Sequence, residues 1–209
     1  MIARMSGNIS SFFVARGIIS VDDRDVYLYC FEVLLSTLTS FLTLAILAIA
    51  SNTVVMTAVF LIGFVPLRRM AGGYHANSHF RCFTTLLITY SVFLLLLYLL
   101  PQGFRVPATI LSIVLSTAAV FRFAPSEDTN KPLLLIESVR LKKRSRIISV
   151  CSVVVVCLLT VFVPDKRYAL SLALGYSTVG VFLLVSFVKV YLIEKIKREQ
   201  KGERNNEEE

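Results

Sequence analysis

The residues best suited to chemistry in this 209-residue sequence gather in one short segment, from Arg68 to Cys82, which reads RRMAGGYHANSHFRC. The segment contains both histidines of the chain, one of its four cysteines and three arginines, and it has no acidic residue. A cysteine thiolate is a strong nucleophile, and an adjacent histidine is a common general base for it. The segment therefore predicts nucleophilic cysteine chemistry.

His75 and Cys82 are the candidate base and nucleophile. Cys82 directly follows an arginine and precedes a long apolar run, so we expect it in the first turn of a helix, where the helix dipole favours a thiolate. Along one straight helix, seven residues would separate the two side chains by about 10 Å, too far for a hydrogen bond. The pair therefore requires a bend, which Gly72 and Gly73 permit.

Two alternatives to cysteine catalysis remain open from the residues alone. His75, His79 and Cys82 have the spacing i, i+4 and i+7, and zinc accepts these ligand types in a catalytic site that also holds a water. The segment contains no acidic residue that would serve as the general base of a zinc peptidase. The other alternative is a basic loop that binds lipid head groups in a non-enzymatic membrane transporter.

The composition indicates an integral membrane protein. Hydrophobic residues make up 56% of the chain, charged residues 17%, and the mean hydropathy is +0.72. Soluble domains carry about 25% charged residues. We therefore expect the lipid bilayer as a partner, no nucleic acid and no cofactor.

The apolar runs predict an all-α, polytopic fold with about six transmembrane helices, because about 20 apolar residues cross the hydrocarbon core. The first run is too long for one helix and is broken by Ser51, Asn52 and Thr53, which predicts a helical hairpin. Its second arm, 54–67, is short, and we expect it to be re-entrant, tilted or completed by the residues that follow. The charge-free runs are 33–67, 83–104, 106–121, 147–164 and 168–188.

The ends of the chain differ in character from the apolar runs. Apolar residues recur among polar ones over residues 1–20, which is typical of an amphipathic segment at the membrane interface. We predict a single membrane-embedded peptidase domain over residues 1–190 and a charged cytoplasmic tail over 191–209.

The distribution of basic residues predicts the orientation. Nineteen of the 22 Lys and Arg residues fall before the first run, in segments 68–81 and 122–146, or after residue 188. The opposite face has only Arg105, Lys166 and Arg167. The positive-inside rule then predicts a multi-pass protein of the cell membrane with both termini and the 68–82 segment in the cytoplasm.

Two motifs resemble the signature of the accessory gene regulator protein B family. One is the RRxxGGxHA frame at residues 68–76 with the Cys82 that follows it, and the other is APSEDTNKP at residues 124–132, followed by basic residues. The resemblance covers essentially the whole chain. It implies a membrane cysteine endopeptidase of Gram-positive bacteria that processes the propeptide of a cyclic autoinducing peptide for quorum sensing. His75 and Cys82 match the family's catalytic pair, and His79 does not, which counts against zinc.

The resemblance also implies the course of the reaction. The family cleaves its propeptide at the C-terminal side of the future signal and holds the peptide as a thioester, which a cysteine or serine of the peptide attacks to close a thiolactone or lactone. By analogy with the family, we expect a homodimer. The candidate substrate-binding residues are basic side chains, for peptide carboxylates or lipid, and glycines that permit close approach: Arg68, Arg69, Gly72, Gly73, Lys142, Lys143 and Arg144.

Overall fold

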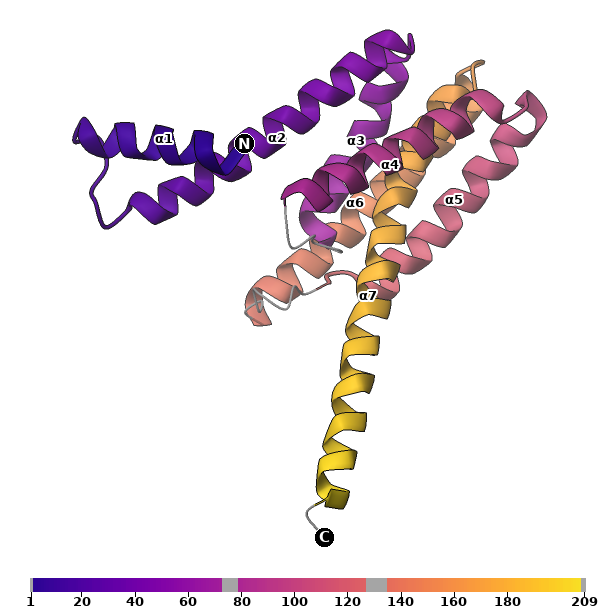
Figure 1. Ribbon diagram of the computed structural model, residues 1–209. Helices are drawn as coiled ribbons and strands as arrows, with labels where there is room; N and C mark the ends of the chain where they lie inside the picture. Colours follow the sequence, from indigo (N-terminus) through magenta and orange to yellow (C-terminus); the bar gives the residue numbers. More distant parts are fainter. Residues whose placement is uncertain (1, 73–78, 127–134, 208–209) are drawn as a thin grey trace. The chain divides into compact units, whose positions relative to one another are not determined.

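The protein is helical throughout the part of the chain that the computed structural model describes, residues 2–72, 79–126 and 135–207. Over these residues the backbone departs from helix only in short connections and in one isolated β-bridge. The all-α prediction is therefore confirmed. The helices, shown in Figure 1, are α1 (Ile2–Ala15), α2 (Arg24–Ala50), α3 (Val54–Ala71), α4 (His79–Leu99), α5 (Gln102–Phe123), α6 (Leu135–Phe162) and α7 (Arg167–Glu207).

Six of these helices, α2 to α7, are long and apolar enough to cross a membrane, as predicted. The predicted break in the first apolar run is also present, because α2 ends at Ala50 and α3 begins at Val54. Asn52 adopts a left-handed conformation in the turn, with φ of 53°. The second arm is completed by the residues that follow it: α3 continues through Arg68 to Ala71, which gives it 18 residues.

Several helices extend beyond the apolar runs from which they were predicted. The fourth span was predicted from the charge-free run 106–121, but α5 begins four residues before this run, at Gln102. Pro107 lies inside α5 and has no N–H to donate to the carbonyl of Gly103, four residues earlier. The helix tolerates this proline because Gly103 is exposed in the first turn, so its carbonyl is not buried without a partner. Likewise α6 begins at Leu135 and α7 continues to Glu207. Hydropathy marks the part of a helix that lies in the membrane, whereas backbone hydrogen bonds continue past it.

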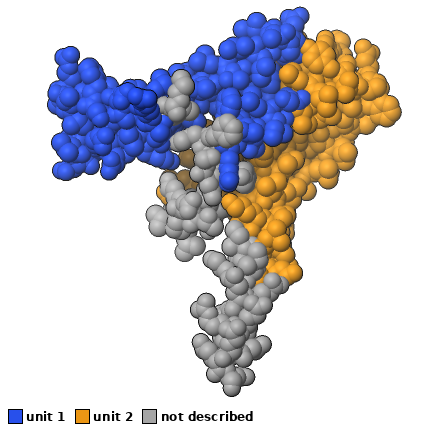
Figure 2. Space-filling model, in the orientation of Figure 1, with its two compact units in different colours: residues 1–54, 76–91 blue, residues 55–75, 92–209 orange. Residues whose placement is uncertain are grey.

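The chain divides into two compact units, which are coloured separately in Figure 2: residues 1–54 with 76–91, and residues 55–75 with 92–209. In the first unit α1 packs against α2. The buried Ser10 hydroxyl donates to the carbonyl of Arg24 at 3.1 Å, and the rings of Phe13 and Phe31 lie 5.4 Å apart. Met5 and Phe12 are exposed on α1. The location of α1 at a membrane interface stays a prediction, as does the single domain ending at residue 190.

Helix α7 is the central helix of the second unit. Within its apolar stretch 56% of the residues are buried, against 33% or less for each of the other candidate spans. Small residues let neighbouring backbones approach it, which is the usual basis of helix association in membranes. A Cβ atom on Gly175 would collide with the carbonyl oxygen of Phe60 in α3, and one on Gly180 would lie 3.0 Å from the Cα of Ser116 in α5.

A buried polar cluster joins three helices of the second unit. The hydroxyl of Tyr176 in α7 bonds to that of Ser149 in α6, and it lies 3.1 Å from the hydroxyl of Thr117 in α5. Tyr176 and Ser149 are fully buried. Because no water reaches such a site, these bonds favour one register of α5, α6 and α7 over slipped alternatives.

Candidate functional site

Gly72 directly follows the last residue of helix α3 and lies within the predicted catalytic segment. Its φ is +69°, a left-handed conformation that favours glycine. The next contact explains why no side chain fits: a Cβ on Gly72 would lie 2.7 Å from the carbonyl oxygen of Ser126. The N–H of Ser126 donates to the carbonyl of Ala71 at 3.0 Å, and Gly72 and Ser126 form a parallel β-bridge. The two sequence motifs therefore meet at this point.

Two side chains fix this junction to α7. The guanidinium of the half-buried Arg68 donates to the carbonyl of Gly72 and lies 5.3 Å from the ring centroid of Phe182. On the Ser126 side of the bridge, the hydroxyl of Ser126 lies 2.7 Å from that of the buried Ser186. The bridge between Gly72 and Ser126 is thus bound to the best-packed helix of the second unit.

Cys82 occupies the predicted place in its helix. Helix α4 begins at His79, so Cys82 lies in its first turn, and it is exposed. The first four N–H groups of a helix have no intrahelical acceptor, and the dipole makes this end electropositive. A nucleophilic sulfur at this position is accessible to a substrate and is close to groups that stabilise negative charge.

The predicted break in the Arg68–Cys82 segment is confirmed, because α3 ends at Ala71 and α4 begins at His79. His75 and Gly73 lie outside the described residues. The pairing of His75 with Cys82 therefore stays a prediction, and so does the zinc alternative, which shares His75.

The remaining candidate substrate-binding residues are exposed cations on helices. Arg69 lies in the last turn of α3 and is exposed. Lys142, Lys143 and Arg144 lie on α6, which begins at Leu135, so they are helical and exposed, whereas the next residue, Ser145, is fully buried. These cations are available to an acidic ligand or to lipid, and the choice between the two stays open.

Sequence reasoning missed the contribution of α7 to the site. Ser186 lies within an apolar run, where one serine is an ordinary occurrence, and Phe182 resembles any lipid-facing aromatic residue. Ser186 is 60 residues from Ser126 in the sequence, and Phe182 is more than 100 residues from Arg68. The one signal in the sequence was that Ser126 lies in the second motif.

The six candidate spans fit a multi-pass α-helical membrane protein. The chain belongs to the accessory gene regulator B family, whose model matches residues 6–193. It is similar to the accessory gene regulator protein B of Staphylococcus aureus strain MRSA252, with 28% identity over 155 residues, 73% of this chain and 78% of the relative. The protein of the same name from strain MW2 is 26% identical over the same shares. No solved structure matches the chain.

Proposed function

We propose that this protein is an integral membrane cysteine endopeptidase that cleaves the C-terminal part of a quorum-sensing propeptide and supports its cyclisation. The family membership supports a role in accessory gene regulation. The observation that carries the proposal is the placement of Cys82: it is exposed in the first turn of α4, ten residues after Gly72, where the backbone pairs with Ser126.

The first half of the proposed reaction is acyl transfer to Cys82. His75 takes the proton of the thiol, and the sulfur attacks the carbonyl carbon of the scissile peptide bond. The C–N bond then breaks, and His75 returns the proton to the departing amine. The products are a C-terminal peptide fragment with a free amino group and a thioester between Cys82 and the rest of the propeptide.

The second half is ring closure. A thiol or hydroxyl of the bound peptide attacks the thioester carbonyl, gives up its proton and expels the sulfur of Cys82, which regenerates the enzyme. For a peptide thiol this is an exchange of one thioester for another and is near thermoneutral. The peptide's own nucleophile competes with water because it is held close to the thioester at high effective concentration.

The basic residues take separate roles in this proposal. Arg68 already donates to the Gly72 carbonyl and lies against Phe182, which supports its holding the loop. Arg69 is exposed and supplies charge for substrate carboxylates. Lys142, Lys143 and Arg144 attract an acidic C-terminal part of the propeptide from the exposed surface of α6. The backbone at Gly72 and Gly73 gives the substrate close approach.

The test is cleavage of the propeptide by the full-length protein in membrane vesicles. We expect Cys82→Ala and His75→Ala each to abolish release of the C-terminal fragment. His79→Ala and Cys151→Ala, the latter also an exposed cysteine of the chain, should cleave at the wild-type rate. Chelators should have no effect. Normal cleavage by Cys82→Ala would refute the proposal, and loss of activity both on chelation and in His79→Ala would favour the zinc alternative.

A further inference from the structure

A second concentration of basic side chains lies at the end of the second unit away from Gly72 and Ser126. Helix α5 runs 22 residues, about 33 Å, between the two ends. At its beginning lies an open cavity of about 390 Å³. The cavity is lined by all three basic residues that the charge distribution assigns to the face opposite the cytoplasm. The proposed peptidase chemistry uses none of them. The lining residues are Gln102, Arg105, Pro164, Asp165, Lys166 and Arg167.

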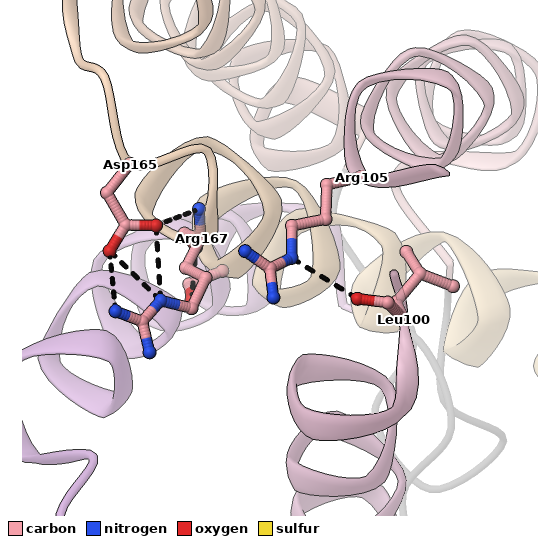
Figure 3. Close-up of polar contacts among 5 residues, drawn as sticks. Leu100, Arg105, Asp165 and Arg167 are labelled. Atoms are coloured by element: carbon pink, nitrogen blue, oxygen red, sulfur yellow. Dashed lines mark hydrogen bonds and ion pairs between the residues drawn. The ribbon is translucent and has the colours of Figure 1, made fainter. Parts of the chain in front are cut away.

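The single acid of the cavity neutralises one of its three cations. Arg167 donates through Nη2 to Oδ2 of Asp165 at 2.8 Å and through Nε to both carboxylate oxygens, at 2.9 and 3.1 Å (Figure 3). These hydrogen bonds hold the pKa of Asp165 below its usual value, so the carboxylate is ionised at neutral pH. The lining therefore keeps a net charge of +2.

The two remaining cations are held in place by backbone acceptors. Arg105 donates through Nε to the carbonyl of Leu100 at 3.3 Å, and its side chain reaches toward the Asp165–Arg167 pair in Figure 3. Its terminal amino groups bond to no acceptor among the residues that the structure describes. Lys166 donates to the carbonyls of Thr160 and Val163 at 2.6 and 2.9 Å and keeps one further N–H. Because both heads are already positioned, a ligand orders little more on binding.

Helix geometry adds to the positive potential of the cavity. Gln102 is the first residue of α5, and Arg167 is the first residue of α7. The electropositive ends of two helices therefore lie at the same cavity. This combination of fixed cations and helix ends suits an anion with several oxygen acceptors.

We propose that this cavity binds a phosphate group, either the head group of an anionic phospholipid or free phosphate. Its volume is within the range of small-molecule sites, and α5 is long enough to bring its first turn to a bilayer surface, where lipid phosphates lie. The site is independent of the peptidase activity, because it lies at the other end of the second unit from the motif junction.

The experiment measures binding to the purified full-length protein in detergent micelles. The probes are phosphatidylglycerol, phosphatidylcholine and sodium phosphate. The test variant is Arg105→Gln with Lys166→Gln, and the matched control, Arg105→Lys with Lys166→Arg, keeps both charges. Native mass spectrometry counts bound lipid, and thermal unfolding reports on phosphate.

We expect phosphatidylglycerol to bind the wild type and the charge-preserving control at least tenfold more tightly than the neutral double variant. For phosphatidylcholine, the difference in affinity between these proteins should be smaller. If only sodium phosphate shows this dependence on Arg105 and Lys166, the ligand is the free anion. Equal binding of both anionic probes to the wild type and the neutral double variant would overturn the proposal. The single variant Arg105→Gln leaves the Lys166 bonds intact and gives the same comparison if the double variant fails to fold.

Discussion

At the residue scale, Gly72 has two separate reasons to be glycine. Its positive φ costs about 1–2 kcal/mol for other L-residues, and the carbonyl of Ser126 occupies the space that a Cβ would need. The chain offers a comparison, because Gly17 has a similar φ of 66° and no neighbouring atom near its missing Cβ. Alanine at Gly17 therefore incurs only the backbone penalty, whereas alanine at Gly72 incurs the same penalty and also disrupts the contact between the two motifs.

We predict that Gly72→Ala lowers propeptide cleavage at least tenfold, because the methyl group forces Gly72 and Ser126 apart and moves the backbone that leads to His75. Gly17→Ala should reduce thermal stability through its backbone conformation and leave the cleavage rate near that of the wild type. Cleavage rates of the two variants, measured at equal amounts of folded protein, check this. Wild-type cleavage by Gly72→Ala would show that the junction has no part in catalysis.

At the element scale, the close approach of α3, α5 and α7 depends on glycines. The Gly175 position faces the backbone of Phe60, which cannot move away as a flexible side chain would. At Gly103, also in the second unit, no neighbouring atom lies within 4 Å of the position that a Cβ atom would occupy. The same substitution at the two sites therefore compares an overpacked helix contact with an open helix position.

Gly175→Ala should destabilise the protein by about 1–3 kcal/mol, the usual cost of overpacking, because α3 must shift away from α7. Gly103→Ala should be neutral or stabilising by up to about 1 kcal/mol, since alanine is the better helix former. Thermal unfolding of both variants in the same detergent measures the difference. Equal unfolding temperatures would mean that α3 and α7 do not approach closely at Gly175.

The apolar pattern was sufficient to predict which segments form the candidate spans and where the first apolar run breaks, because burial in lipid requires long apolar stretches. It could not predict helix ends such as Gln102 and Leu135, since backbone hydrogen bonds continue where hydropathy stops. Cys82 and Gly72 were predictable from residue type and neighbours. The contact of Ser126 with Ser186 was not, because it depends on tertiary packing between segments 60 residues apart.

At the scale of the whole molecule, the junction of Gly72 with Ser126 and the cavity lined by Arg105 and Lys166 lie at opposite ends of α5. The charge distribution predicts that the junction faces the cytoplasm, where a newly made propeptide is available, and that the cavity faces outward. This orientation would place the proposed peptidase site on the side of the membrane where its propeptide is made.

Site-directed labelling tests the orientation in a chain whose native cysteines are replaced by alanine. A membrane-impermeant maleimide should label Gly103→Cys in intact cells, because this exposed position lies in the first turn of α5, on the face that the charge distribution predicts to be outside. It should label Lys143→Cys, exposed on α6, only after the membrane is permeabilised. Labelling of Lys143→Cys in intact cells would contradict the predicted topology.

The most direct test of the peptidase mechanism is the mass of the protein during turnover. When the propeptide is mixed with the full-length enzyme and the reaction is quenched in acid, we predict an adduct equal to the propeptide minus its C-terminal fragment, attached at Cys82 and removed by hydroxylamine. Cys82→Ala should form no adduct, while His79→Ala should form it normally. Efficient release of the C-terminal fragment without any adduct, or with an adduct on another residue, would contradict the mechanism.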